Sequence, residues 1–185
     1  MELASGVEFP DMKAPMKLTS LSLLVLVFTL LAGCKPKAPE VTDLQRKEAA
    51  NLVSEAQFAI TLRDLPRAEP LLAKAAQLAP DTAEYWVNLG AIRRRMDNKS
   101  GAKQAYEQAL KAYRADQDDK KDEIRIEGIL QEVHVLALLG RADDARTRLE
   151  KALKKEPENR ILKRFAEDRQ LDRMLEDPGF KDVAL

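Results

Sequence analysis

The sequence predicts an all-α fold in which helical hairpins stack side by side into a solenoid. Its composition favours helices, because charged residues make up 34% and aromatic residues 5% of the chain, with only seven glycines in 185 residues. Small and large apolar residues also recur at helical spacing, and the whole pattern returns after roughly 34 residues. The length suggests one domain.

The stretch 81–110 shows the pattern most clearly, as two short antiparallel helices. Gly90 lacks a side chain, so the second helix can approach the first at this point. One face of each helix carries the packing residues, which are Trp86, Leu89 and Gly90 in the first and Ala102, Tyr106 and Ala109 in the second. We therefore expect Gly90, Ala102 and Ala109 to lie buried at a helix crossing.

Local signals place the ends of these helices. Asp81 and Glu84 predict a capping box at the start of the first helix, and Asp97 with Asn98 predicts the turn and the next cap. Upstream, Thr42 and Gln45 predict a cap for a helix that reaches about Leu62.

The packing pattern recurs on both sides of this hairpin. Ala68, Leu72, Ala75 and Pro80 lie 34 residues before Ala102, Tyr106, Ala109 and Arg114, and the set returns as Ala145, Leu149, Ala152 and Pro157. The arrangement W-x2-L-G … A-x3-Y-x2-A resembles the tetratricopeptide repeat, whose period is about 34 residues. The resemblance implies a solenoid of about three repeats with a C-terminal capping helix.

The predicted boundaries follow from these repeats. We assign residues 44–80 to repeat 1, 81–123 to repeat 2 with an extended second helix, 124–157 to repeat 3, and 158–185 to a capping helix and tail. Residues 112–127 carry a dense mixture of opposite charges, which is either an interaction patch or, as we favour, an extended helix and a solvated turn. We expect the apolar stretch 124–139 to be the most buried helix, and Phe180 to pack on the last one.

The N-terminal stretch has the layout of a secretory signal, assigned to residues 1–33. Leu18 to Leu31 is 14 residues without a charge, preceded by Lys17. Leu31-Ala32-Gly33-Cys34 resembles a bacterial lipobox, which implies lipidation of Cys34 and a tether over residues 34–43; a plain uncleaved anchor is the alternative. The acidic residues 1–15 indicate that translation starts at Met12 or Met16.

By resemblance to lipoprotein sorting, Lys35 after the cysteine favours the outer membrane, with the protein facing the periplasm.

The near-neutral charge argues against nucleic acid as a partner. No motif for phosphate binding, hydrolysis or metal binding occurs, so we expect no catalytic residue, metal, cofactor or small-molecule substrate. The single histidine, His134, is a ligand or general base, or, as we favour, an exposed or groove-lining residue.

The resemblance implies that the first helices of successive repeats line a concave surface that binds an extended peptide or a helix. Asn88 falls where the family often uses an asparagine amide to bind a peptide backbone, and Ser54 and Gln131 take the matching places. The other candidate binding residues on this face are Gln57, Glu84, Arg94 and His134.

The sequence as a whole therefore predicts a membrane-anchored, non-enzymatic adaptor or assembly factor of the bacterial cell envelope that binds another protein. The alternatives are an accessory subunit of an envelope enzyme complex, such as peptidoglycan, secretion or pilus machinery, and a self-associating structural protein.

Overall fold

Helices account for nearly all of the computed structural model, which describes residues 40–115 and 122–185. Over these two ranges the chain has no strand. The helices are α2 (Asp43–Thr61), α3 (Leu65–Leu78), α4 (Ala83–Arg95), α5 (Lys99–Ala115), α6 (Asp122–Leu138), α7 (Ala142–Lys155), α8 (Arg160–Glu167), α9 (Gln170–Glu176) and α10 (Pro178–Lys181). The expected all-α solenoid of helical hairpins is confirmed.

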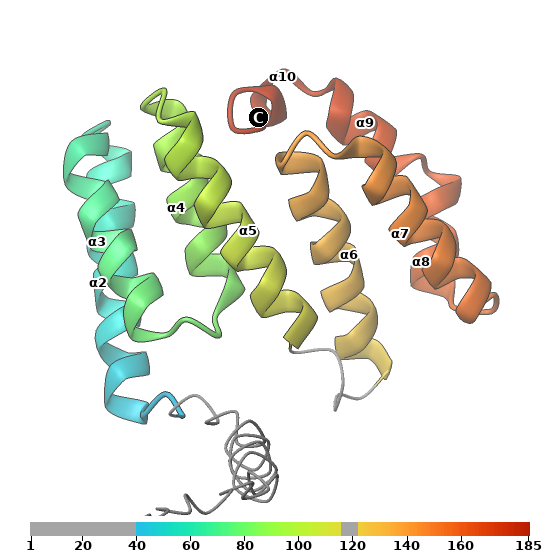
Figure 1. Cartoon of the computed structure of the whole chain (residues 1–185), viewed down its shortest axis with the longest axis horizontal. Helices are drawn as coiled ribbons and strands as arrows, with labels where there is room; N and C mark the ends of the chain where they lie inside the picture. The colour runs from blue at the N-terminus through green and yellow to red at the C-terminus, as the bar shows by residue number, and fades with distance from the viewer. Residues whose placement is uncertain (1–39, 116–121) are drawn as a thin grey trace, which may run out of the picture. The chain divides into compact units, whose positions relative to one another are not determined.

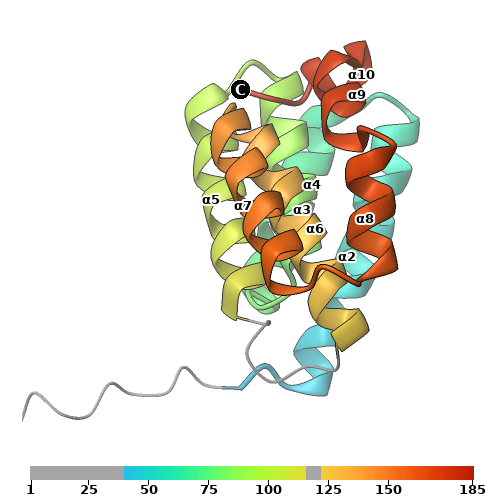
Figure 2. The same cartoon turned by 90° about the vertical axis from the view of Figure 1, so that its right-hand side faces the viewer.

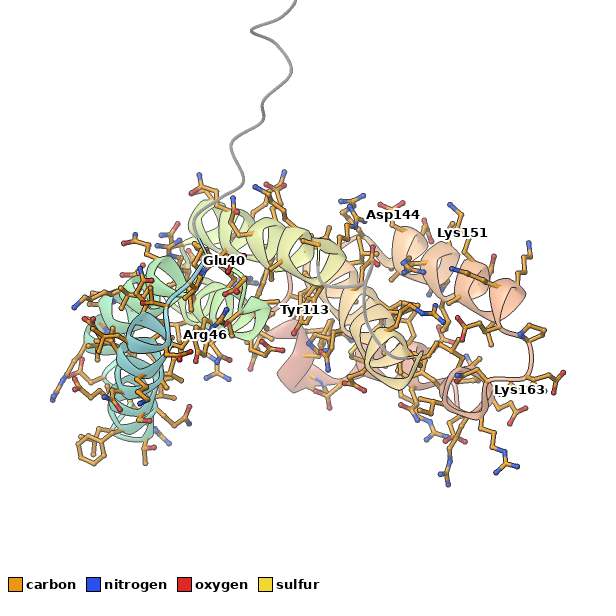
Figure 3. The ribbon with its side chains drawn as sticks, turned by 90° about the horizontal axis from the view of Figure 1, so that it is seen from below. Glu40, Arg46, Tyr113, Asp144, Lys151 and Lys163 are labelled. Atoms are coloured by element: carbon orange, nitrogen blue, oxygen red, sulfur yellow. The ribbon has the colours of Figure 1, made fainter. Side chains whose placement is uncertain are left out.

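The helices of the unit Val41–Leu185 pack as successive antiparallel pairs, α2 with α3, α4 with α5, and α6 with α7 (Figure 1). Seen along the helices, α2, α4 and α6 form one layer and α3, α5 and α7 the other (Figure 3). The row curves so that the first helices lie on its inner side. Asp144 and Lys151 of α7 lie on the outer side, whereas Lys163 of α8 lies on the inner side (Figure 3). We call the surface formed by α2, α4 and α6 the inner face.

The close approach expected in the central hairpin is present. Gly90, Ala102 and Ala109 are all buried between α4 and α5. A Cβ atom added to Gly90 would lie 2.4 Å from Cε1 of Tyr106, so no other residue fits there without a shift of the ring. The small residues of the repeat pattern therefore set the distance between the two helices, as the sequence predicted.

Two of the predicted caps are also confirmed. Thr42 Oγ1 accepts from the Gln45 backbone N–H, and Gln45 Oε1 accepts from the Thr42 backbone N–H, which completes a capping box for α2. Asn98 Oδ1 accepts from the Gly101 N–H at 2.9 Å in the first turn of α5, after Asp97 has turned the chain with φ 60°.

The capping box predicted at Asp81 and Glu84 is wrong. The N-cap of α4 is Thr82, and it makes no side-chain capping hydrogen bond. The Asp81 carboxylate instead accepts from the Arg46 guanidinium of α2, at 3.2 and 2.6 Å. Both oxygens of the carboxylate are taken by the bidentate pair with the guanidinium, so the contact between repeats takes the carboxylate away from the helix end.

Helix α6 has the buried apolar character that the sequence predicted. Its buried residues include Ile126, Ile129, Val133, Val135, Leu136, Ala137 and Leu138, whereas Leu130 is partly buried. Helix α5, with 17 residues against 14 in α3, is the longer second helix. Residues 116–121 of the charged run lie outside the described residues, as do the predicted signal sequence, Cys34 and the tether up to residue 39.

The C-terminal end differs from the single capping helix that was expected. Asn159 caps α8, as predicted, by accepting from the Ile161 and Leu162 N–H groups. Helix α8 is eight residues long and ends at Glu167. Arg169 then adopts a left-handed conformation with φ 50° and is the N-cap of α9. The short α10 follows Asp177, and the chain then crosses between the ends of α4 and α6 to the C-terminal end of α6, where the Leu185 N–H donates to the Leu138 carbonyl (Figures 1 and 2).

Candidate functional site

The residues predicted to bind a partner lie on or beside the inner face. Ser54, Gln57, Glu84 and Asn88 are exposed, whereas Arg94, Gln131 and His134 are half-buried. All come from α2, α4 and α6, so the stacking of the hairpins does bring them to one side of the molecule. They differ, however, in whether their polar groups are available to a ligand.

Two members of the predicted polar column are occupied within their own helix. Ser54 Oγ donates to the Ala50 carbonyl at 3.0 Å, and Gln131 Nε2 donates to Glu127 Oε1 at 2.8 Å. The amide of Asn88 makes no side-chain hydrogen bond to any residue that the structure describes, and it is exposed. Among the described residues, Asn88 is therefore the member of the column whose side chain is wholly available to a peptide as donor and acceptor.

Glu84 is tied to the second helix of its own hairpin. Tyr113 Oη donates to Glu84 Oε1 at 3.3 Å, across the space between α4 and α5. Burial raises the pKa of Tyr113, and the neighbouring Glu84 charge adds to this effect, so the hydroxyl stays protonated and remains a donor. Glu84 thus joins α4 to α5 through this hydrogen bond, in addition to its exposed position on α4.

Arg94 and the packing residue Tyr106 bind the end of the chain. Arg94 Nε donates to the Ala184 carbonyl at 2.7 Å, and Tyr106 Oη donates to the Val183 carbonyl at 2.6 Å. Burial raises the pKa of Tyr106, and the charges of Arg94 and Arg95 only partly oppose this, so its hydroxyl also stays a donor. Sequence reasoning placed Arg94 on the binding face but gave no sign that the chain's own end occupies it.

His134 lies against Phe180 of α10. The two rings meet edge to face, with centroids 5.6 Å apart and an interplanar angle of 81°. Phe180 was expected to pack on the last helix; it shares a hydrophobic cluster with Leu162 and Leu171, and its ring also contacts His134 of α6. Burial lowers the pKa of His134, which favours a neutral imidazole at neutral pH.

A basic cavity of about 730 Å³ adjoins this contact. It lies where the α2–α3 turn, the end of α4 and α10 meet, and it is lined by Arg63, Arg94, Arg95, Asp97, Lys181 and Asp182. Cationic groups outnumber carboxylates here, so the cavity favours a negatively charged group of a ligand. These residues come from three separate segments, and the repeat pattern offers no signal that would group them.

No group of three or more potential metal-ligating side chains occurs among the residues that the structure describes. In the same part of the chain, no helix is both long and apolar enough to span a bilayer.

Comparison with known families supports the resemblance noted in the sequence. The tetratricopeptide repeat family model matches residues 83–116, which begin with the first residue of α4 and extend just past the end of α5. No curated protein sequence matches the chain. Tetratricopeptide repeats commonly bind other proteins, so the match suggests a role in protein–protein interaction.

Proposed function

We propose that the chain is a lipid-anchored, non-enzymatic adaptor or assembly factor of the bacterial cell envelope, and that its inner face binds an extended segment of another protein. The tetratricopeptide repeat match at residues 83–116 supports an interaction role. The lipobox at Leu31–Cys34 supports attachment to a membrane, with the repeats on the periplasmic side of the outer membrane.

The hydrogen bond from Arg94 to the Ala184 carbonyl is the observation that carries the binding proposal. It places a first-helix side chain at hydrogen-bonding distance from a main-chain carbonyl that follows the turn after α10. Asn88 lies six residues before Arg94 on α4, with its amide exposed. The two residues together offer donors and an acceptor to a peptide laid along the inner face.

The groove is tested by a pull-down with an Asn88→Ala, Arg94→Ala double variant. We expect the recovery of partner proteins from native membranes, identified by mass spectrometry, to fall at least tenfold, since two hydrogen-bonding side chains are lost. A matched control replaces Gln104 and Lys103, an exposed amide and cation on α5, by alanine. Circular dichroism verifies that both double variants are folded. If the two variants recover partner proteins equally well, the proposal that the inner face binds the partner is contradicted.

The membrane anchor is tested separately with Cys34→Ser. The hydroxyl of serine does not form the thioether that attaches the diacylglycerol, so we expect no labelling by a fatty-acid analogue and release of the protein from membranes. Two acyl chains contribute about 0.8 kcal/mol for each buried methylene, which accounts for firm attachment. Labelling that persists in the serine variant contradicts lipidation at this residue.

A further inference from the structure

The C-terminal segment Asp177–Leu185, here called the tail, is held on the inner face mostly through its main chain. Arg94 and Tyr106 donate to two consecutive tail carbonyls, and the Leu185 N–H donates to the Leu138 carbonyl at 2.9 Å. None of the three bonds uses a tail side chain. Any peptide that adopts the same turn offers the same carbonyl and amide groups, so this surface can hold other segments in the same way.

One tail side chain supplies the apolar anchor. Phe180 is 8% exposed, and its ring meets His134 edge to face at 5.6 Å. Main-chain hydrogen bonds combined with one buried aromatic anchor are the usual elements of peptide recognition. The contacts of the tail therefore indicate that this surface binds a peptide through its main-chain groups and one aromatic side chain.

The basic cavity adds a charge preference. Lys181 and Asp182 belong to the tail, so they leave the cavity if the tail leaves. The remaining lining is then Arg63, Arg94 and Arg95 against the single carboxylate of Asp97. Asp182, two residues after Phe180, lines this cavity in the structure. An acidic residue that follows an aromatic one at this spacing fits the vacated surface.

The tail is also placed for exchange. Its only helix, α10, is four residues long, and it is joined to α9 through the exposed Asp177–Gly179 segment. Lys181, Asp182 and Leu185 are exposed as well. The affinity of any ligand for the same surface is reduced by the fraction of molecules in which the tail is docked.

We infer, on the basis of the groove function proposed above, that the tail is a displaceable internal ligand of the inner face. The partner is a polypeptide segment that carries an aromatic residue followed two positions later by an acidic one in the same turn, and it binds by replacing the tail on Arg94, Tyr106 and His134.

The first test measures binding of a fluorescent peptide with the sequence of residues 177–185 to the full-length chain in detergent. Phe180→Ala removes the anchor of the internal tail, so we expect at least tenfold tighter peptide binding than in the wild-type chain. Phe58→Ala is the matched control, because Phe58 is a 60% exposed phenylalanine of α2; it should bind as the wild type does. Equal affinity of Phe180→Ala and the wild type overturns the inference.

Peptide variants test the chemistry of the anchor and the charge. With the Phe180→Ala chain, we expect alanine in place of the peptide's phenylalanine to weaken binding at least tenfold. Asparagine in place of the aspartate that corresponds to Asp182 should weaken it severalfold and reduce the dependence of binding on salt concentration. A peptide that binds equally well without its aromatic ring overturns the stated partner chemistry.

Hydrogen exchange in the wild-type chain supplies a test that does not depend on how a variant folds. Saturating unlabelled peptide should accelerate exchange of the Leu185 amide and its tail neighbours, while amides of α6 stay protected. A tail that remains as protected as α6 at millimolar peptide is a permanent part of the fold, which overturns the inference.

The outcomes separate this inference from the proposed adaptor function. If the Phe180→Ala chain binds the peptide tightly but the Asn88 and Arg94 variant does not alter recovery of envelope partners, the tail inference holds and the adaptor proposal fails. The reverse pattern, with partner recovery dependent on Asn88 and Arg94 but a tail that never exchanges, overturns the tail inference alone.

Discussion

Gly90 determines how closely the helices of the central hairpin approach. Its missing side chain leaves room for the Tyr106 ring, which lies against the α4 backbone and is fully buried. The same ring carries the hydroxyl that reaches the Val183 carbonyl. The glycine therefore acts beyond the hairpin, because it fixes the position of a donor on the inner face.

We predict that Gly90→Ala lowers the free energy of unfolding by about 1–2 kcal/mol. Alanine favours a helix over glycine by about 1 kcal/mol, but overpacking a filled core costs about 1–3 kcal/mol, and here the added Cβ meets the ring at 2.4 Å. Urea denaturation measures the change. In a Tyr106→Leu background the same substitution should be neutral or stabilising, and a loss of equal size there contradicts the steric explanation.

At the scale of elements, Glu132 joins three helices. This carboxylate of α6 is 2% exposed, and it accepts from Arg114 Nε of α5 at 2.7 Å and from Arg148 Nε of α7 at 2.6 Å. It is an acidic residue within the apolar run of α6, and sequence reasoning did not single it out. Its position between the second helices of two repeats fixes how repeat 3 sits on repeat 2.

We expect Glu132→Gln to lower the free energy of unfolding by about 1.5–3 kcal/mol, the range for a lost hydrogen bond between charged groups in a buried position. The amide keeps the shape of the side chain but removes the charge and offers only one oxygen to two guanidinium groups. Urea denaturation compares this variant with Glu150→Gln, an exposed glutamate of α7. Losses of equal size in the two variants contradict the role assigned to Glu132.

At the scale of the whole unit, the chain end closes on the inner face of the row, between α4 and α6 (Figure 1). His134, which meets Phe180 in this arrangement, has a pKa lowered by burial, so the folded chain favours the neutral imidazole. Burial of His134 therefore opposes its protonation, which makes the stability of the fold sensitive to acid at this residue.

We predict that the stability of the wild-type chain falls more steeply with acidification than that of His134→Gln. The unfolded chain takes up a proton at the ordinary pKa near 6.5, whereas the folded chain resists it. The free energy of unfolding is unaffected by His134 above pH 6.5, where the residue is neutral in both states. It decreases as the pH falls from 6.5 through the lowered pKa of the folded chain, by about 1.4 kcal/mol in total for each unit by which the pKa is lowered. Thermal unfolding midpoints at pH 7.5 and 5.0 measure this difference, and parallel decreases in the two proteins contradict it.

The central hairpin illustrates how far the sequence alone reaches. Gly90, Ala102 and Ala109 predicted the helix crossing because small residues at helical spacing have one common use, which is close packing. The caps at Thr42 and Asn98 were equally readable, since both depend on groups within four residues. The cap at Asp81 was not, because a partner 35 residues away competes for its carboxylate.

For the candidate site, the sequence predicted which face the residues share but not whether their polar groups are available to a ligand. The period predicted that Ser54, Asn88 and Gln131 share one face, because residues at equivalent repeat positions face the same way, and Arg94 and His134 were predicted on that face with them. Their availability was not predictable: Ser54 and Gln131 bond within their helices, whereas Arg94 and His134 meet the tail. These outcomes depend on contacts between groups up to 90 residues apart, which no local pattern encodes.

The sequence by itself determined the helices, their pairing into hairpins and the face that each repeat presents, since these follow from short-range spacing of small, apolar and capping residues. Only the tertiary structure decided what lies on that face. The left-handed turn at Arg169 and the course of α10 return the chain end to Arg94, Tyr106 and His134, and the direction of a chain after a turn is set by the packing that it finds.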